Sequence, residues 1–427
     1  MGALAALHRP VDPAGLAVFR MLFGTVLGVL VVRTWASGWI EDLYLAPAVH
    51  FTWVGFDWVR PLPGWGMYFL FVIMGMAALG LALGVRPRLC AGVFGLLFTW
   101  VELIDKAPYL NHYYLVSLLC VLLACIPTDG AFALRCRPSP VPWGAYLLLR
   151  SQLAIVYFFA GFAKLNPDWL FEGQPLATWL PAFAHWPVVG PWLATREAAL
   201  ALAWCGAVFD LTIWIWLAWR PTRRVAWLAA VGFHALVGLM FPIGLFSWVM
   251  AVATTLFFAP DWPRRWMRPF TGGARRAPVF LEVVAGVWLL LQVAVPLRFC
   301  LYPGSVLWTE EGFRFAWRVM LVEKTGQVEY RVSATDPPLE VLVFPRKTLA
   351  PLQYRQLVTQ PDLILDYAHI LADEYRARGH QGVQVRAEAF VALNGRPSQR
   401  LIDPDVDLAA WPRGWAPRPW ILPLAED

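Results

Sequence analysis

Lys164 is the residue whose type and position most clearly point to chemistry. The chain has four lysines among its 35 basic residues, and Lys164 directly follows the apolar, aromatic-rich run 155–163. A lysine in an apolar pocket can be held neutral at physiological pH and act as a base, which an arginine cannot do. The alternative is a lysine at the membrane interface that extends its ammonium group into the polar layer.

His112 is the second candidate, and it stands beside Asn111 in a run of polar and aromatic residues, 102–114. The alternative is an interface histidine held by hydrogen bonds. Ionisable residues within apolar segments are costly and mark either function or partnered structure; here they are Arg20, Arg150, Asp210, His234 and Glu282. In the structural alternative, Arg20 pairs with Asp210 or with a carbonyl group, and Arg150 and Glu282 extend toward the inner face.

The elements that must position these residues are membrane helices. Of the 427 residues, 59% are hydrophobic and 15% are charged, whereas a soluble domain has about 25% charged residues. A single water-soluble globule is therefore excluded. About 20 mostly apolar residues cross the hydrocarbon core, which predicts about nine spans, at 14–33, 66–84, 89–104, 112–126, 143–163, 198–219, 225–240, 243–259 and 278–297. Of these, 112–126 and 225–240 are short enough to be re-entrant, and no cleavable signal is expected before the first span.

Basic residues alternate between the two sides of these spans. The loops after spans 2, 4, 6 and 8 hold twelve basic residues against two acidic ones, and the loops after spans 1, 3, 5 and 7 hold four against eight. Because cytoplasmic loops are enriched in Lys and Arg, we predict a cytoplasmic N-terminus. His112 and Lys164 then lie at the outer boundary of the membrane.

The charge density rises after residue 300, which divides the chain into a helical membrane domain, 1–297, and an extracytoplasmic domain, 298–427. The second part is predicted to be a small α+β domain that uses the membrane domain for part of its core. Alternating and helical patterns predict strands at 327–333, 339–344 and 383–393, a helix at 352–378 and a turn at Asn394-Gly395. The six cysteines have neither a disulfide framework nor metal-ligand spacing, so no metal is expected, and no motif suggests nucleotide or nucleic-acid binding.

These runs also carry a family resemblance, which extends over nearly the whole chain. The chain resembles the vitamin K-dependent γ-glutamyl carboxylase family in its shorter bacterial form, with a horizontally transferred transmembrane domain. The matching segments are Arg9-Pro10-Val11-Asp12-Pro13, Asp105-Lys106 with Asn111-His112, Ile155-Val156-Tyr157-Phe158 with Ala160-Gly161 and Lys164-Leu165, Phe233-His234 with 243–247, 260–263 and 399–407.

The resemblance implies a membrane enzyme in which molecular oxygen epoxidises reduced vitamin K, a phylloquinol or menaquinol, and thereby drives the carboxylation of peptide glutamate by carbon dioxide. The γ-carbon proton of glutamate is far too weakly acidic for side-chain bases, whose pKa values reach only about 10 to 14. Oxidation of the quinol must therefore supply the stronger base. The implied partners are a glutamate-containing peptide or protein and a membrane lipid quinone, in a bacterial plasma (inner) membrane.

By position, Lys164 matches the base that deprotonates the hydroquinone, and His112 matches a histidine of the later carbanion and carboxylation steps. Asn111, His112, Lys164 and His234 would bind the cofactor, and Trp308, Phe313 and Trp317 would lie near the substrate glutamate. The chain departs from animal members at Ala163, where they have a second lysine, and at Phe313, which replaces a tyrosine; their extra outer domains are also expected to be absent. Two alternatives stay open: a quinol epoxidase without carboxylation, and a non-catalytic membrane protein for lipid binding or transport.

Overall fold

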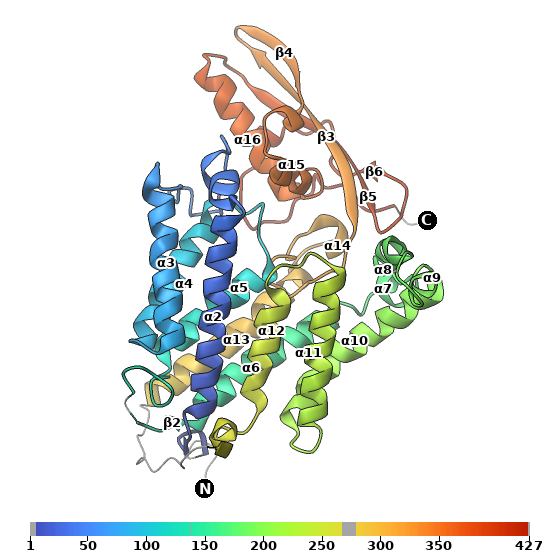
Figure 1. Cartoon of the computed structure of the whole chain (residues 1–427). Helices are drawn as coiled ribbons and strands as arrows, with labels where there is room; N and C mark the ends of the chain where they lie inside the picture. The colour runs from blue at the N-terminus through green and yellow to red at the C-terminus, as the bar shows by residue number, and fades with distance from the viewer. Residues whose placement is uncertain (1–5, 137, 267–278, 426–427) are drawn as a thin grey trace.

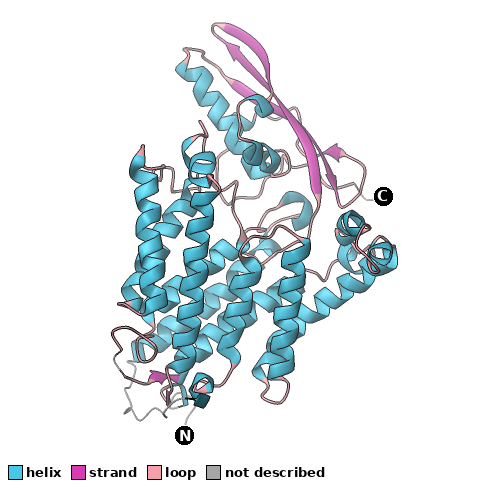
Figure 2. Ribbon diagram, in the orientation of Figure 1, coloured by secondary structure: helices cyan, strands magenta, loops and turns pink. Residues whose placement is uncertain are grey.

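The computed structural model describes residues 6–136, 138–266 and 279–425, and it consists of a bundle of apolar helices with a small sheet domain at one end (Figures 1 and 2). The N-terminus lies at the opposite end of the bundle from the sheet domain. The predicted class, a multi-pass helical membrane domain followed by a smaller α+β domain, is confirmed.

Seven helices of the described residues are long and apolar enough to cross a membrane. They are α2 (Ala14–Ala36), α3 (Trp65–Leu83), α4 (Pro87–Ile104), α6 (Trp143–Phe162), α10 (Arg196–Ala218), α11 (Arg223–Met240) and α13 (Val279–Leu297). Two apolar helices are shorter: α5 (Asn111–Cys125), and α12 (Phe246–Thr254) with its 3-10 continuation η3 (Thr255–Phe257). At 1.5 to 2 Å per residue each is only about 20 Å long, so the predicted count of nine spans is not confirmed. Of the two segments expected to be short, 112–126 is a short helix and 225–240 is a full-length one, while 243–259 is also short.

Short elements connect these helices. At the end nearer the N-terminus they are β1 (Pro10–Val11), which pairs with β2 (Val141–Pro142), and η4 (Trp262–Trp266). The connections at the other end contain η1 (Glu41–Leu45), α7 (Pro167–Leu170), α8 (Leu176–Trp179), η2 (Leu180–Phe183) and α9 (Gly190–Leu193).

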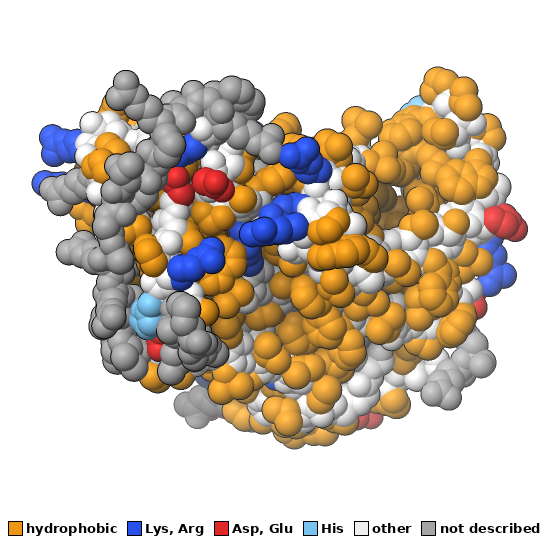
Figure 3. Space-filling view, turned by 90° about the horizontal axis from the view of Figure 1, so that it is seen from below, with side chains coloured by type: hydrophobic (Ala, Val, Ile, Leu, Met, Phe, Trp, Pro, Cys, Tyr) orange, Lys and Arg blue, Asp and Glu red, His pale blue; other side chains and the backbone are white. Residues whose placement is uncertain are grey.

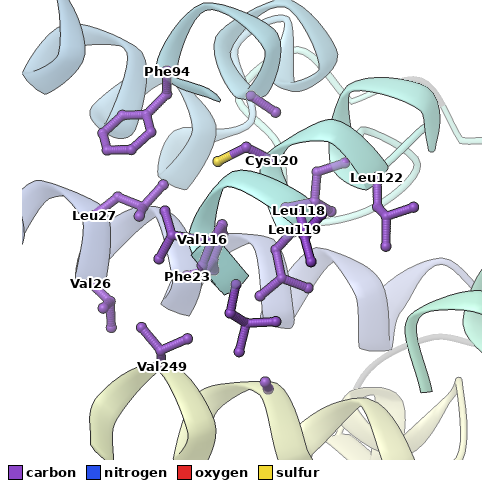
Figure 4. Close-up of a cluster of buried hydrophobic side chains, with 14 of the residues drawn as sticks. Phe23, Val26, Leu27, Phe94, Val116, Leu118, Leu119, Cys120, Leu122 and Val249 are labelled. Carbon is purple, nitrogen blue, oxygen red and sulfur yellow. The ribbon is translucent and has the colours of Figure 1, made fainter. Parts of the chain in front are cut away.

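The interior of the bundle is filled by aliphatic and aromatic side chains from helices distant in the sequence. Phe23 and Leu27 of α2 meet Phe94 of α4, Leu119 of α5 and Val249 of α12 (Figure 4). Since lipid is as apolar as these side chains, close packing rather than removal from water holds such helices together.

Three of the ionisable residues in the apolar segments have structural partners. Arg20 donates to the carbonyl oxygen of Phe132 and not to Asp210, so the carbonyl alternative is the correct one. Arg150 donates to the carbonyl oxygens of Leu256 and Phe258, at 2.8 Å each, where the helical segment of α12 and η3 ends and its carbonyls lack partners within the helix. Glu282 lies 2.5 Å from His8. Asp210 is therefore not the partner of Arg20, and its own partner is described below.

The end of the bundle opposite to the sheet domain displays a group of basic side chains on a largely apolar face (Figure 3). Exposed arginines at this end include Arg88, Arg135, Arg220 and Arg224. Four further arginines of the loops that were predicted to be cytoplasmic lie outside the described residues: Arg137, Arg268, Arg275 and Arg276. The cytoplasmic orientation of this end stays a prediction.

The sheet domain contains four antiparallel strands in the order β4-β3-β5-β6: β3 (Lys324–Thr335), β4 (Pro338–Val343), β5 (Gln384–Leu393) and β6 (Gln399–Arg400). Asn394 and Gly395 have positive φ angles of 50° and 80°, so the predicted turn is confirmed. The helix predicted at 352–378 is two helices, α15 (Pro351–Leu357) and α16 (Pro361–Ala377), because Pro361 has no N–H to continue the first helix and is suited to begin a second. Further short segments are η5 (Arg298–Leu301), α14 (Val306–Thr309), η6 (Pro345–Lys347) and η7 (Leu408–Ala410).

The sheet domain shares its core with the outer ends of the membrane helices, as expected. Trp169 and Ala203 belong to the same buried cluster as Tyr330 and Leu363. Ion pairs reinforce this contact: Lys106 Nζ lies 2.9 Å from Asp362 and 2.7 Å from Asp366. The sheet domain is thus fixed directly above the ends of α4 and α6, where the candidate residues lie.

Candidate active site

A cavity of about 270 Å³ lies between α5, α6, α10, α11 and the segment 317–320. Most of its lining is apolar, and the polar side chains that reach it are Asn111, His112, Tyr157, Lys164, Asp210 and His234. Four of the sequence-predicted residues, Asn111, His112, Lys164 and His234, are therefore brought together from three separate parts of the chain.

Lys164 forms an ion pair with Asp210 inside the cavity. Its Nζ lies 2.8 Å from Oδ2 of Asp210 and 3.2 Å from the carbonyl oxygen of Ala160, and both side chains of the pair are buried. Gly161 makes this pairing possible: a Cβ atom there would lie 2.6 Å from the backbone nitrogen of Leu211 on α10. Because only glycine permits α6 and α10 to approach so closely, Lys164 is carried to the side of Asp210.

The chain after α6 places an aromatic ring over Lys164. Asn166 caps α7 by accepting a hydrogen bond from the backbone N–H of Trp169, at 3.0 Å, and Pro167 is the first residue of that helix. The resulting turn puts the ring centroid of Trp169 5.1 Å from Lys164 Nζ. A cation on Lys164 is thus stabilised by a carboxylate and by the face of an indole.

Tyr157 and His234 form a second polar pair in the cavity. The Tyr157 hydroxyl lies 2.8 Å from Nε2 of His234, and the exposed fractions of the two residues are 1% and 2%. The other ring nitrogen of His234, Nδ1, has no hydrogen-bond partner among the described residues. The imidazole is surrounded by the rings of Phe209, Phe233 and Phe246.

His112 lies at the beginning of α5, and its Nε2 is buried without a hydrogen-bond partner in the described part of the chain. Asn111 serves a structural purpose: its Nδ2 donates to the carbonyl oxygen of Arg318, at 2.9 Å, and its Oδ1 accepts from the Tyr109 hydroxyl, at 3.0 Å. Burial raises the pKa of Tyr109 well above its ordinary value, so this hydroxyl stays a donor. Asn111 therefore holds the segment 315–320 against the cavity.

That segment has an unusual backbone. Phe315, Trp317 and Met320 have φ angles of 59°, 58° and 55°, a region that residues other than glycine seldom adopt and that tends to occur at functional sites. Trp317 lines the cavity and stacks on Tyr114 with a centroid distance of 5.2 Å. Its indole N–H is buried and has no partner among the described residues.

Comparison with protein families now adds to this geometry. Residues 8–262 match the HTTM domain, and residues 278–427 match the lumenal domain of the vitamin K-dependent gamma-carboxylase. The chain belongs to the vitamin K-dependent gamma-carboxylase family. The apolar helices and the lumenal-domain match together describe a carboxylase-type membrane protein whose C-terminal part is lumenal or extracytoplasmic. No solved structure gives a significant match to the chain.

The three aromatic residues that were expected near the substrate glutamate of this carboxylase-type protein do not lie together. Trp317 lines the cavity, whereas Trp308 and Phe313 are absent from its lining. Trp308 is buried in the core of the sheet domain, and its Nε1 donates to the carbonyl oxygen of Leu422 at 2.8 Å. The left-handed residues between positions 313 and 317 turn the chain, so neighbours in sequence point to different surroundings.

Two further polar residues line this cavity, Asp210 and Tyr157, which were not predicted as site residues. Asp210 had been noticed as an ionisable group in an apolar segment, and Tyr157 belongs to one of the segments that carry the family resemblance. Their partners could not be identified from the sequence, because nothing in it links position 210 to position 164. No group of three or more His, Cys, Asp or Glu side chains in the described residues could hold a metal ion.

Proposed function

We propose that this protein couples the oxygen-dependent epoxidation of reduced vitamin K to the carboxylation of peptide glutamate. The observation that carries the proposal is the buried Lys164–Asp210 pair in an apolar cavity that also holds His112 and the Tyr157–His234 pair. A cavity used only for lipid binding does not need a buried base with a carboxylate partner. Family membership supports a carboxylase-type membrane protein, and the coupled reaction is the proposal.

The cavity suits a lipid quinol. Its lining is aromatic and aliphatic, with Leu115, Val156, Phe209, Val237 and Met250 among the residues that would surround a fused ring and an isoprenoid tail. Polar groups lie on two sides, the Lys164–Asp210 pair and the Tyr157–His234 pair, and these would bind the two hydroxyl groups. When bound, reduced vitamin K would supply, on oxidation by molecular oxygen, the strong base that no side chain can provide.

Lys164 is assigned as the group that accepts a proton from a quinol hydroxyl at its Nζ. To do so it must start as the free amine beside the ionised carboxylate of Asp210, so that the pair carries one proton fewer than it does as an ion pair. After proton transfer, the new ammonium group is stabilised by Asp210 and by the Trp169 ring, as the aspartate of a catalytic triad stabilises the imidazolium beside it. The cavity also excludes water from this step.

His112 is assigned to the carboxylation half of the reaction. Its unpartnered Nε2 can hold or donate a proton at the outer end of the cavity. A peptide would approach from the side of the sheet domain, which we place outside the plasma membrane with the N-terminus in the cytoplasm. Carbon dioxide would be the second substrate of this half.

The first experiment tests the base. The purified full-length protein, in nanodiscs with reduced vitamin K and oxygen, is assayed for epoxide, and Lys164→Ala is expected to lower the rate by about 10²- to 10⁴-fold, the usual contribution of a general base. Lys347→Ala removes an exposed lysine of the sheet domain and is expected to leave the rate unchanged. An unchanged rate in Lys164→Ala contradicts the catalytic assignment.

The second experiment separates the coupled reaction from epoxidation alone. The same preparation is incubated with labelled hydrogencarbonate and a glutamate-containing peptide, and label is expected in the peptide while epoxide forms. Epoxide without labelled peptide identifies a quinol epoxidase instead. In this assay His112→Ala is expected to lower carboxylation more than epoxidation, and equal losses count against separate roles for His112 and Lys164.

A further inference from the structure

A second polar location lies at the outer edge of the cavity, beside Arg33. This arginine belongs to the last turn of α2, and its guanidinium carbon lies 4.8 Å from the ring centroid of Trp39. Among the described residues no carboxylate forms an ion pair with its guanidinium group. A guanidinium group without an acidic partner at a membrane boundary is available to an anion from outside.

Arg33 and His112 face the same point in space, above Gly244 in the link between α11 and α12. A Cβ atom on Gly244 would lie 3.6 Å from Nη1 of Arg33 and 3.8 Å from Nε2 of His112, and apart from its chain neighbours no other atom of the described residues would be within 4 Å. The φ angle of Gly244 is +63°, so a side chain would be strained there. Because glycine has no Cβ atom, the position that a Cβ would fill is free, and it lies next to both a guanidinium nitrogen and an unpartnered, buried imidazole nitrogen.

This arrangement matches the chemistry of a carboxylate. A guanidinium group binds a carboxylate through its fixed fork of N–H donors, and a protonated Nε2 can donate to the other oxygen. We propose that Arg33 and His112 bind a carboxylate at this point, and that Arg33 is a substrate-binding residue. The inference rests on the proposed function, because that reaction brings the γ-carboxylate of peptide glutamate to the site; hydrogencarbonate, which is in equilibrium with the carbon dioxide substrate, is the competing anion.

Of the two anions, the γ-carboxylate of glutamate would be stabilised more by such a site during the reaction. Removal of a proton from the carbon next to a carboxylate creates a second negative charge beside the first. A fixed cation that is directed at the place where this charge develops stabilises it, because it needs no reorganisation during the reaction. Arg33 would supply that cation, and His112, assigned to carboxylation, touches the same point.

The test measures binding and needs no turnover. Purified full-length protein in nanodiscs is titrated calorimetrically with a glutamate peptide and with its glutamine twin, for the unsubstituted protein, Arg33→Gln, Arg33→Lys and Arg220→Gln. We expect a preference for glutamate of about 10- to 100-fold, the usual effect of a charge-assisted contact. Arg33→Gln is expected to reduce it to less than about twofold, Arg33→Lys to retain part of it, and Arg220→Gln, at the other end of the bundle, to leave it intact.

A second arm identifies the source of the carboxylate. The KM for hydrogencarbonate and the KM for the peptide are measured in Arg33→Gln, and a rise of the peptide KM alone assigns the site to glutamate, while a rise of the hydrogencarbonate KM alone assigns it to that anion. An Arg33→Gln protein that keeps the full glutamate preference and both KM values overturns the inference. A protein that binds glutamate through Arg33 but forms neither epoxide nor carboxylated peptide contradicts the proposed function and leaves the carboxylate site standing.

Discussion

Nζ of Lys164 lies 2.8 Å from Oδ2 of Asp210, within an apolar cavity formed by helices that are distant in sequence. The two residues are 6% exposed each. Removal of either partner would leave the other buried without compensation, which is costly for a charged group. In the proposed function, the role of Asp210 is therefore to support the position and the charge of Lys164 rather than to act on the substrate.

The role of Asp210 can be tested with Asp210→Asn, which keeps the shape of the side chain and removes the charge. We expect epoxide formation to fall by at least about tenfold, because a proton accepted by Lys164 would no longer be stabilised by an anion. The measurement is the rate of epoxide formation as a function of pH, in which the substitution should shift the profile as well as lower it. Asp373→Asn removes an exposed carboxylate of the sheet domain and serves as the control. If Asp210→Asn changes neither the rate of epoxide formation nor its pH profile, Asp210 has no part in the mechanism.

Tyr157→Phe tests the second polar pair. The substitution removes the hydroxyl that bonds to Nε2 of His234 and leaves both ring nitrogens without a partner. An unsatisfied buried polar group costs about 1–3 kcal/mol, so a lower thermal midpoint is expected together with weaker quinol binding. Phe158→Leu, on the neighbouring exposed ring, is the control, and a Tyr157→Phe protein with an unchanged thermal midpoint and unchanged quinol affinity would contradict this role.

Seven of the nine predicted spans are helices long and apolar enough to cross a membrane, because the length of an apolar run depends only on local composition. The turn at Asn394-Gly395 could be predicted for a similar reason, since few residue pairs adopt its positive φ angles. The ends of helices were less certain, and Pro361 shows why: the periodic pattern of 352–378 continues through a residue that must interrupt the hydrogen bonds of the first helix.

The polar partners could not be predicted, because they depend on how closely helices approach. From the sequence, Arg20 could pair either with Asp210 or with a carbonyl group. In the structure, the close packing of α6 on α10 at Gly161 places Asp210 beside Lys164. The separation of Trp308 from Trp317 follows from a left-handed backbone at residues that are not glycine, which no local preference indicates. Asn111, His112, Lys164, His234 and Trp317 line one cavity while Trp308 and Phe313 do not, and their roles stay predictions.

Acid is expected to loosen the contact between the sheet domain and the membrane helices. Burial alone would raise the pKa of Asp168, but hydrogen bonds from Arg396, at 2.7 and 2.8 Å, and from Asn394 lower it. A carboxyl group whose pKa is lower in the folded protein stabilises the fold above its unfolded pKa of about 3.9, and this stabilisation is lost as the pH falls further. The ion pairs of Asp362 with Arg314 and Lys106 lower the pKa of that carboxyl in the same direction, against the effect of burial.

The measurement is hydrogen exchange of the sheet domain at pH 7 and pH 3. Protection of the strands near Arg396 should fall at the lower pH, and Asp168→Asn should weaken this pH dependence while lowering stability at pH 7 by about 2 kcal/mol. Glu340→Gln, in an exposed ion pair of β4, is the matched control, since such pairs contribute little. Equal protection at both pH values would show that these carboxylates do not hold the two domains together.

The attachment of α13 can be tested through a hydrogen-bond network inside the membrane domain. Trp288 Nε1 donates to Oε1 of Gln152, at 2.8 Å, and Nε2 of Gln152 donates to Oε1 of Gln292, at 3.1 Å. Most of the other side chains of α13 face outward, so this network is a large part of what binds α13 to α6. Gln152→Leu is expected to lower the stability of the membrane domain by about 0.6–2 kcal/mol, measured as a lower thermal midpoint in nanodiscs.

The double substitution Gln152→Leu with Gln292→Leu discriminates between two explanations of the stability lost in Gln152→Leu. If the cost comes from polar groups left without partners, the double variant should recover part of the lost stability, because two apolar groups of similar size replace both members of one bond. If the cost comes from lost packing, the two effects should add. Since α13 leads directly into the segment that carries Trp317, the single variant should also weaken quinol binding, and full affinity with a lowered thermal midpoint would show that α13 does not control the cavity.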